Sequence, residues 1–525
     1  MASKTPQSSR APRSAAVGAA LDRFAAGQLA EALPRQRWFG SKSRRIVAVA
    51  VRDAAPLGAG APGAWLALVD VVFDRGAAEM YVVPVLVRAD GEPDAEGFGR
   101  VDVEGAVLRV TDALGDAGVC GALLAALAED RTLRARRGTI RFVREAAFPQ
   151  SAAAGGVAAR RLSGEQSNTS IVYGDVLILK VFRRPEPGPN PEHEVTAFLT
   201  TRARFPSVPQ LAGAVEYDPA GGERVTLAVL HRFTPNRGDG FTWVLEHLGR
   251  LADFVAARVE HEPLGGERLV QLVRDFSAGV LGATRRLGAL TGGLHVALAS
   301  DAADPAFAPE PVTAADVARW TERITGDLGL TLEVLRGRLA DLPTPVRRRA
   351  EALLADPAGL SARLAGLETL AAEGCARIRV HGDYHLGQTL RTDDGFVILD
   401  FEGEPARPLA ERRAKHSPLC DVAGMVRSLD YAAATMLGGG EGPRAAGDTW
   451  RRLAADAFLD GYLGETARAP ARLVPATRPA LARALAPFAL DRALYEVRYE
   501  IDHRPAWVDV PLRGLERLRA GESVA

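Results

Sequence analysis

The chain has 525 residues, of which 47% are hydrophobic and 25% charged, and this composition is typical of a soluble globular protein with a large core. At about 150 residues per domain, the length predicts roughly three compact units. The 65 basic side chains equal the 65 acidic ones, so the net charge is zero and gives no global attraction to nucleic acid or to an anionic membrane.

The cysteines Cys120, Cys375 and Cys420 form no C-x-x-C pair, which disfavours a disulfide framework or a thiolate zinc site and is typical of a reducing compartment. No uninterrupted apolar run reaches the roughly 18 residues that a membrane helix needs. The N-terminal residues are small and polar without the apolar core of a signal peptide, so 1–19 is predicted to be a disordered tail. These features predict a cytoplasmic protein.

A small helix-plus-sheet unit is predicted over residues 20–100. It begins with an amphipathic helix that ends near Pro34. Apolar strand-like runs, separated by Gly, Pro and Asp turns, follow at 45–51, 65–73 and 81–88.

A second unit is predicted over residues 101–233, where a helix-like apolar stretch is followed by more strands. Three consecutive antiparallel strands are expected at 157–163, 169–175 and 176–184. A proline-rich loop then leads to a helix from residue 192, and two further strands follow. From residue 234 helical patterns dominate, so 234–525 is predicted to be a mostly helical lobe and the fold class is α+β.

One segment of the helical half, HGDYHLGQTLRTDDGFVILDFEGEP at 381–405, is unusually rich in carboxylates and histidines. Asp394 and Gly395 lie between two strand-like runs and give a strong hairpin signal. The hairpin would bring Asp383 close to Asp400. Phosphoryl transfer uses such a pair, because one carboxylate accepts the proton of the acceptor hydroxyl and the other holds Mg²⁺ on the nucleotide phosphates. We therefore interpret Asp383 as the catalytic base and Asp400 as a metal ligand.

The spacing inside this segment also matches the protein-kinase pattern, in which an amide side chain follows the catalytic aspartate five positions later. Gln388 occupies that position, and Glu402 adds a second carboxylate after Asp400. Because a hard divalent cation prefers oxygen ligands, Gln388, Asp400 and Glu402 are the predicted Mg²⁺ ligands. The alternatives for this segment are a structural polar hairpin and a zinc site on His381 and His385. Gly382 stands where the zinc motif H-E-x-x-H requires glutamate.

The nucleotide half of such a site is expected upstream. Lys180 lies in an apolar strand-like run, where burial is costly without an anionic partner, and Glu194 is the first candidate for that partner and Glu192 the second. The stretch SGEQSNTS at 163–170 lies between two strands, and its N–H groups and hydroxyls suit a phosphate loop. The predicted nucleotide contacts there are Ser167, Asn168, Thr169 and Ser170. Taken alone, the loop is an ordinary turn and the lysine a structural one, but the order of all the parts is that of a kinase.

These motifs resemble those of aminoglycoside-phosphotransferase-like enzymes, which share the protein-kinase fold. Longer segments resemble the bacterial maltokinases more closely, namely 35–44, 164–170, 180–195, 400–433 and 495–512. The resemblance implies a bilobal protein-kinase-like fold with an N-terminal cap, a β-rich intermediate subdomain and a mostly helical C-lobe. It also implies ATP and Mg²⁺ as cofactors.

The bacterial maltokinases make maltose 1-phosphate from maltose and ATP. The resemblance therefore implies phosphorylation of the anomeric hydroxyl of maltose, as a step towards α-glucan and glycogen synthesis with trehalose synthase as a partner. His385 would neighbour the sugar, Asp421 would brace the catalytic loop, and His381 is left as loop scaffold.

Sugar contacts are expected from aromatic and charged side chains near the C-terminus. Tyr495 and Tyr499, like Glu496 and Glu500, are four residues apart and share a helix flank. The alternative is that the tyrosines belong to the core and the glutamates to a solvated face. The predicted sugar contacts, beside His385, are Asp430, Tyr431, Tyr495, Glu496, Tyr499, Arg504 and Trp507.

Two other functions stay open. A related small-molecule kinase, acting on glucosamine or an aminoglycoside, would share the catalytic core. A non-catalytic sugar- or nucleotide-binding regulator is disfavoured by the intact Lys180, Asp383 and Asp400. The remaining histidines are expected at the surface or at helix caps without a functional role, and they are His193, His247, His261 and His295.

Overall fold

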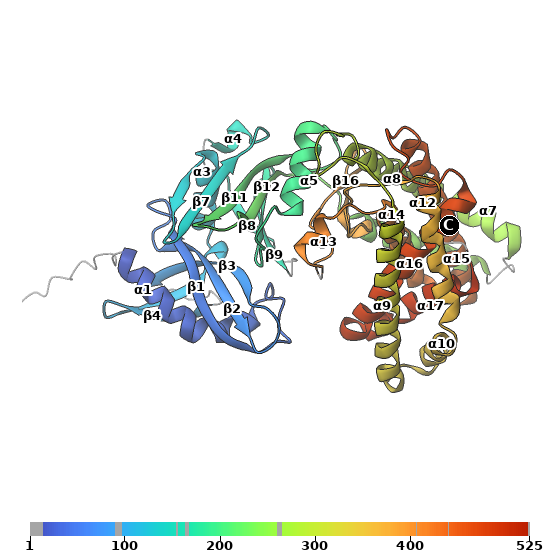
Figure 1. The fold of residues 1–525 in the computed structure, drawn as a ribbon, viewed down its shortest axis with the longest axis horizontal. Helices are drawn as coiled ribbons and strands as arrows, with labels where there is room; N and C mark the ends of the chain where they lie inside the picture. The colour runs from blue at the N-terminus through green and yellow to red at the C-terminus, as the bar shows by residue number, and fades with distance from the viewer. Residues whose placement is uncertain are drawn as a thin grey trace, which may run out of the picture. The chain divides into compact units, whose positions relative to one another are not determined.

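The computed structural model describes residues 14–89, 97–153, 156–162, 167–259, 265–405, 407–438 and 440–522. The chain divides into two compact units (Figure 1). The sheet unit consists of Met1–Ala197 and Pro209–Pro235, and the helical unit consists of Phe198–Val208 and Asn236–Ala525. A β-rich first half and a helical second half are what the sequence predicts.

The sheet unit begins with an antiparallel five-stranded sheet in the order β1-β2-β3-β5-β4. Its strands are β1 (Ile46–Pro56), β2 (Ala64–Phe73), β3 (Glu79–Ala89), β4 (Gly97–Val103) and β5 (Ala106–Asp112). Side chains on both faces of β2 and β3 are buried, which accounts for their nearly continuous apolar runs. Helix α1 (Ser14–Phe24) packs beside β4, so residues 14–19 are helical rather than part of the predicted disordered tail. The sheet extends to Asp112, past the expected boundary at residue 100.

A second, seven-stranded sheet follows in the order β6-β7-β11-β12-β10-β9-β8. Its strands are β6 (Thr132–Arg134), β7 (Gly138–Arg144), β8 (Ala159–Arg161), β9 (Asn168–Tyr173), β10 (Leu177–Phe182), β11 (Leu211–Pro219) and β12 (Val225–Arg232). The predicted run of three antiparallel strands is confirmed by β8, β9 and β10. Strands β6 and β7 were not predicted. Three helices accompany this sheet, namely α3 (Ala117–Ala128), α4 (Gln150–Ala153) and α5 (Pro191–Ala197).

One buried carboxylate ties the two sheets together. Asp53 lies on β1 and is 1% exposed. It accepts hydrogen bonds from the backbone N–H groups of Arg136 (2.8 Å) and Arg137 (3.1 Å), between β6 and β7. It also accepts one from the hydroxyl of Tyr217 on β11 at 2.9 Å. The buried carboxylate is thus satisfied by donors of the second sheet, and these three bonds join the two sheets.

The helical unit contains the long helices α6 (Gly240–Val259), α7 (Gly266–Phe276), α8 (Ala278–Leu298), α9 (Ala314–Arg338), α10 (Thr344–Ala355), α14 (Leu419–Ala434), α15 (Glu441–Thr466), α16 (Arg478–His503) and α17 (Asp509–Ala520). Shorter helices are α11 (Ala358–Ser361), α12 (Glu368–Ala372) and α13 (Leu409–Arg413). Helices α8 and α15 pack against each other along their length, and α16 contacts α9, α14 and α17.

A β-hairpin interrupts these helices. Strands β15 (Thr389–Arg391) and β16 (Phe396–Ile398) pair antiparallel, and the N–H of Thr392 donates to the carbonyl of Gly395 at 2.9 Å. The hairpin predicted from Asp394 and Gly395 is therefore confirmed. It places residues 381–388 at one end of the segment close to residues 399–402 at the other.

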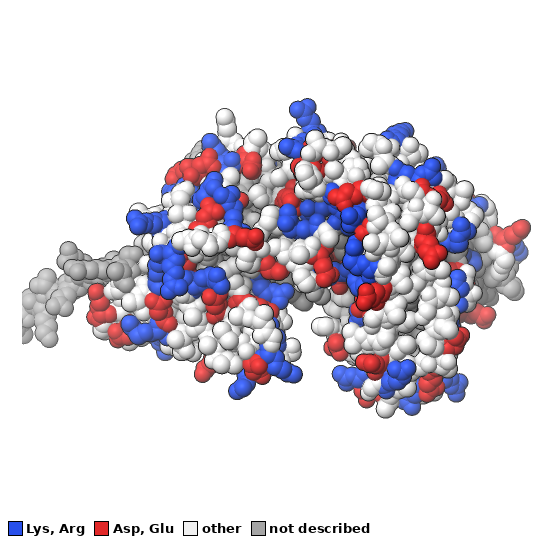
Figure 2. Space-filling model, in the orientation of Figure 1, with Lys and Arg blue, Asp and Glu red and all other residues white. Residues whose placement is uncertain are grey.

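Basic and acidic side chains are interspersed over the visible face of each unit (Figure 2), in keeping with the zero net charge. Within the described ranges, none of the helices combines the length and the apolar composition required to cross a bilayer.

Candidate active site

The loop that begins with His381 is held in place by a buried carboxylate on α14. Asp421 accepts hydrogen bonds from the N–H groups of His381 (2.8 Å) and Gly382 (2.9 Å). Further along α14 the hydroxyl of Ser428 accepts the N–H of Leu386 at 3.1 Å. Helix α14 therefore fixes the loop at both ends, and Asp421 has the bracing position that the family resemblance implies.

At Gly424, helix α14 also packs directly against the backbone of the loop. A Cβ atom on Gly424 would clash with the carbonyl oxygen of Tyr384, so any larger residue would push the loop away. The buried hydroxyl of Tyr384 is paired with that of Thr291 on α8 at 2.9 Å.

His295 completes the environment of Asp421. Its Nε2 donates to Asp421 Oδ2 at 3.0 Å, and its Nδ1 lies 3.0 Å from the hydroxyl of Tyr462. Burial raises the pKa of Asp421, but the hydrogen bond and charge of His295, the nearby His381 and the N–H of Gly382 outweigh burial, so the pKa lies below its ordinary value. The expectation that His295 is a surface or capping residue is wrong, because it is fully buried.

Two other histidines that were expected at the surface or at helix caps are also less exposed than expected. His247 is buried and lies 2.9 Å from the hydroxyl of Ser277, and burial lowers its pKa to about 4. His193 is half-buried, and burial lowers its pKa as well. His261 lies outside the described residues.

The carboxylate of Asp383 is oriented by an arginine that is not among the predicted site residues. Arg492 Nη1 on α16 donates to Asp383 Oδ1 at 2.9 Å, which leaves Oδ2 as the oxygen for an acceptor hydroxyl. His381 Nε2 donates to the carbonyl of Leu399 at 2.7 Å and thereby joins the loop to the residue before Asp400. His381 is thus loop scaffold, as predicted.

His385 is a neutral hydrogen-bonding group at the edge of this site. Burial lowers its pKa, and the opposing charge of Asp383 restores only part of the shift. Nδ1 accepts the N–H of Gly387 at 3.1 Å, so the hydrogen-bond network assigns the ring proton to Nε2. His385 can therefore donate a hydrogen bond to a ligand oxygen at neutral pH.

Asp400 and Gln388 form the core of the predicted metal site. Gln388 Nε2 lies 3.2 Å from Asp400 Oδ2, and a rotated amide would present Oε1 there instead. Asp400 has a φ of 64°, a left-handed conformation that is uncommon outside glycine. Within the described part of the chain, no three His, Cys, Asp or Glu side chains converge to form a metal cluster. The donor set of one carboxylate and one amide, with Glu402 two residues on, fits a Mg²⁺ ion that also binds substrate phosphates.

A pocket of about 450 Å³ lies beside Asp383 within the helical unit, and this volume is in the usual range for small-molecule sites. The tyrosine rings of α16 stack with centroids 6.1 Å apart. The side chains that line the pocket are those of Phe241, Asp383, His385, Pro405, Ser428, Tyr431, Arg492, Tyr495, Glu496, Tyr499, Glu500 and Arg504. The pocket therefore brings most of the predicted sugar contacts together beside the predicted base.

Two predicted contacts do not line this pocket. Asp430 lies on a different face of α14 from Tyr431, because consecutive helical residues do not share a face. Its carboxylate accepts from Arg427 (2.6 Å) and Arg517 (2.7 Å), so its assignment to the sugar pocket is wrong. Trp507 is absent from the lining and lies with its ring 6.0 Å from the Arg504 guanidinium.

Five lining side chains were absent from the predicted set, namely those of Phe241, Pro405, Ser428, Arg492 and Glu500. Helical spacing could have identified Arg492 and Glu500, because it puts them on the face of α16 that carries Tyr495 and Glu496. Phe241 comes from α6, far away in the sequence, and nothing local marks it.

Glu500 has an unsatisfied oxygen at this pocket. The residue is 1% exposed, and its Oε1 accepts from Arg504 (2.6 Å) and from the hydroxyl of Tyr431 (3.2 Å). Its Oε2 is buried without a hydrogen-bond partner, and burial raises the pKa of the carboxyl despite Arg504. Buried polar atoms are nearly always paired, so a ligand hydroxyl or ammonium group would satisfy this oxygen.

The predicted nucleotide residues lie in the sheet unit. Lys180 on β10 is opposite Ser170 on β9, and Asn168 shares their face of the sheet. Residues 163–166 of the predicted phosphate loop lie outside the described residues, and Ser167 is exposed beside them. Lys180, Asn168 and Ser170 are thus on one face, next to the start of that loop.

Thr169 lies on the opposite face. Its hydroxyl accepts from the Nε of Arg183 at 2.8 Å, and Arg183 also binds Asp112 of the five-stranded sheet through Nη2 at 2.6 Å. Arg183 is fully buried and lies over the Trp38 ring. The predicted contact of the Thr169 side chain with nucleotide is therefore wrong, since Thr169 fastens β9 to the first sheet.

Helix α5 covers the face that carries Lys180. His231 on β12 shares that face, and its Nε2 lies 3.8 Å from Glu192 Oε1 and 3.5 Å from Thr196 Oγ1. Glu192 is buried, whereas Glu194, two residues on, is turned to a different side of the helix and is half-buried. The sheet-facing carboxylate of α5 is thus Glu192, the second candidate from sequence.

Comparison with known proteins identifies the first sheet. The family described as "Maltokinase N-terminal cap domain" matches residues 33–116. A glucosamine kinase of Streptacidiphilus jiangxiensis is 30% identical over 352 residues, which cover 66% of this chain and 70% of that protein. A glucosamine kinase of Mycolicibacterium smegmatis is 29% identical over 369 residues, covering 68% of this chain and 79% of that protein.

Solved structures agree over nearly the whole length. A glucosamine kinase in complex with glucosamine, ADP and inorganic phosphate covers 97% of this chain and 100% of its own, with 25% identity and a TM-score of 0.62. A second crystal form of a glucosamine kinase covers 95% of this chain and 99% of its own, with 25% identity and a TM-score of 0.64. The predicted fold class, including an N-terminal cap, is confirmed.

We expect Asp421→Asn to lower the free energy of unfolding by about 3 kcal/mol at pH 7, because it leaves buried donors without their anionic acceptor. The pKa of Asp421 is lowered in the folded state, so its contribution is present above the unfolded pKa of about 4 and is lost as the pH falls through the folded pKa. Denaturant unfolding of both proteins at pH 7 and at low pH measures this.

The matched control is Asp460→Asn, which breaks a surface ion pair with Arg478. It should change stability by less than about 1 kcal/mol. An Asp421→Asn protein as stable as this control at pH 7 would contradict the bracing role.

Proposed function

The chain belongs to the maltokinase-like family of sugar kinases that includes the glucosamine kinases, and from this premise we propose that it transfers the γ-phosphoryl group of ATP to the anomeric hydroxyl of maltose. The observation that carries the proposal is the pocket beside Asp383, with its tyrosines and buried carboxylates. Trehalose synthase as supplier of maltose, and α-glucan synthesis as consumer of the product, remain predictions.

Asp383 is the proposed base. Its Oδ2 accepts the proton of the sugar hydroxyl while the hydroxyl oxygen bonds to the γ-phosphorus, the bond to the β,γ-bridging oxygen breaks, and ADP leaves with that oxygen. Arg492 holds Oδ1 and so aims Oδ2. His385 Nε2 can donate to a second sugar oxygen, and this bond orients the acceptor.

Mg²⁺ is the proposed metal cofactor. When bound, it neutralises charge on the nucleotide phosphates. Asp400 and Gln388 would hold it with oxygen atoms, and Glu402 is placed to join them. Lys180 is proposed to bind phosphate oxygens, with Glu192 rather than Glu194 as its anionic partner.

The length of the pocket supports a disaccharide. Arg492, at the end of the pocket near Asp383, and Glu500 are separated by eight residues of α16, a rise of about 12 Å at 1.5 Å per residue. This is longer than a single hexose ring. Tyr495 and Tyr499 line the interval with stacked rings that can cover sugar faces, and Glu500 Oε2 offers an acceptor at the far end.

Glucosamine is the competing substrate. The curated relatives at about 30% identity are glucosamine kinases. Three carboxylates line the pocket, those of Asp383, Glu496 and Glu500, and they suit an ammonium group as well as hydroxyls.

A substrate panel separates these possibilities. With ATP and Mg²⁺, we expect ADP release to depend on maltose, with a higher kcat/KM than for glucosamine or glucose, because only a disaccharide contacts both ends of the pocket. Coupled measurement of ADP together with identification of the phosphorylated carbon provides the readout. Turnover of glucosamine alone would refute maltose specificity, and hydrolysis of no ATP with any sugar would favour the non-catalytic regulator.

The proposed base is tested by Asp383→Asn. Removal of the base should lower kcat by roughly 10²- to 10⁴-fold, while nucleotide binding stays near that of the wild type. Steady-state kinetics and nucleotide titration measure the two effects. Asp394→Asn, in the exposed hairpin turn, is the matched control and should be as active as the wild type. Equal turnover of the two variants would remove Asp383 from the base role.

The lysine partner is tested by a pair of variants on α5. We expect Glu192→Gln to lower kcat/KM for ATP by about 10- to 100-fold, because the lysine that binds the phosphates loses its anionic partner. Glu194→Gln should have little effect, since that side chain is turned away from the Lys180 face. Kinetics at varied ATP concentration distinguish the two, and the reverse order would restore Glu194 as the partner.

A further inference from the structure

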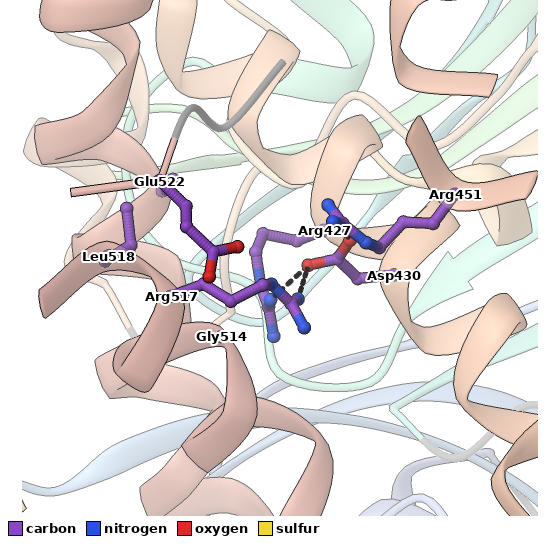
Figure 3. A pocket seen from close by; sticks show the side chains of 8 residues that line it. Arg427, Asp430, Arg451, Gly514, Arg517, Leu518 and Glu522 are labelled. Carbon is purple, nitrogen blue, oxygen red and sulfur yellow. Dashed lines mark hydrogen bonds and ion pairs between the residues drawn. The ribbon is translucent and has the colours of Figure 1, made fainter. Parts of the chain in front are cut away.

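A second, much smaller cavity lies behind the sugar pocket, where α14, α15, α16 and α17 meet. Figure 3 shows the side chains of Arg427, Arg451 and Arg517 gathered around the carboxylate of Asp430. Asp430 Oδ2 accepts from Arg427 Nη1 at 2.6 Å and from Arg517 Nη2 at 2.7 Å. Arg451 Nη1 lies 3.6 Å from Oδ1. One carboxylate thus engages cations from three helices.

The same arginine also binds a residue that lines the sugar pocket. Arg427 donates through Nε (3.1 Å) and Nη2 (2.6 Å) to a single oxygen of Glu496, Oε2. The other oxygen, Oε1, lies 3.8 Å from Arg492 Nε. Because Arg492 in turn binds Asp383, charges of alternating sign run from the base to α17.

This arrangement sets the orientation of Glu496. A fork of two donors on Oε2 turns Oε1 away from Arg427, and Glu496 is among the residues that line the sugar pocket. If Arg427 lost Asp430, its full charge would be compensated by Glu496 alone. The carboxylate would then be drawn towards Arg427 and away from Arg492 and the sugar.

We propose that Asp430 and Arg517 are positioning residues for the sugar end of the active site, acting through Arg427 on Glu496. The proposal gives a function to Asp430, which does not itself touch the sugar pocket. It rests on the proposed role of Glu496 as a sugar ligand.

Two further observations support a built network. Asp430 Oδ1 and Arg451 Nε are both buried without a hydrogen-bond partner, one an acceptor and the other a donor. Both residues line the cavity, whose volume of about 20 Å³ is enough for one water molecule. A Cβ atom on Gly514 of α17 would clash with the guanidinium of Arg427. The absence of a side chain at this position therefore gives the guanidinium the space that it occupies.

The test uses a matched pair of charge removals on α17. Arg517→Gln removes a cation of the network, whereas Arg513→Gln, one turn earlier, removes a cation that binds Asp509 instead. We expect Arg517→Gln to lower kcat/KM for the sugar by roughly 10- to 100-fold, mainly through KM, with KM for ATP unchanged. Arg513→Gln should match the wild type in both constants.

Two more variants keep the result interpretable. Gly514→Ala displaces Arg427 without changing any charge, and it should reproduce the sugar-specific rise in KM. Asp430→Asn should do the same to a greater degree, and thermal unfolding shows whether each variant is folded. Folded Arg517→Gln and Gly514→Ala proteins with wild-type KM for the sugar, or with equal losses for sugar and ATP, would overturn the proposal.

A crystal structure of Asp430→Asn, in which Arg427 has lost its second anion, provides a readout that does not depend on activity. The proposal requires Glu496 to shift towards Arg427, and an unchanged Glu496 side chain would also overturn it. If the wild type phosphorylated neither maltose nor glucosamine, the substrate proposal would fail while this structural comparison still decided the positioning role.

Discussion

The carboxylate of Asp421, which is 1% exposed, accepts two consecutive backbone N–H groups of the predicted catalytic loop and the Nε2–H of the buried His295. A backbone held in this way has little freedom, so the side chains that follow it point in fixed directions. Asp383 and His385 reach the pocket from this loop, and Gln388 ends it next to Asp400. The orientation of the proposed base and metal ligands therefore depends on a residue that does not itself line the pocket.

Helix α14 has two functions because its residues face two ways. One side carries Asp421 and Ser428 against the catalytic loop, and Tyr431 lies in the pocket. Another side carries Asp430 towards α17, with Arg427 between the two. The pocket is completed by α16, whose lining residues recur at helical spacing. Two packed helices thus hold the proposed acceptor site, in agreement with the general advantage of rigid elements over loops for precise geometry.

Local signals predicted a large part of this structure. The Asp394-Gly395 hairpin and the strands β8 to β10 were predicted from short stretches of sequence, whereas the bracing role of Asp421 was implied by the family resemblance. Asp430 was placed wrongly because adjacency to Tyr431 in sequence is not adjacency on a helix, and Thr169 because its face of β9 is set by a contact with Arg183. Arg492 was missed although its spacing to Glu496 was visible. Phe241 and the strands β6 and β7 depend on contacts with distant parts of the chain, which no local pattern reports.

The left-handed backbone at Asp400 has a consequence for how this position can evolve. Glycine, asparagine and aspartate adopt such a conformation with the least strain, and of these only aspartate carries a charge. Glutamate would keep the charge but strain the turn, and asparagine would keep the turn but lose the charge. Backbone and chemistry therefore select the same residue independently, and neither asparagine nor glutamate meets both requirements.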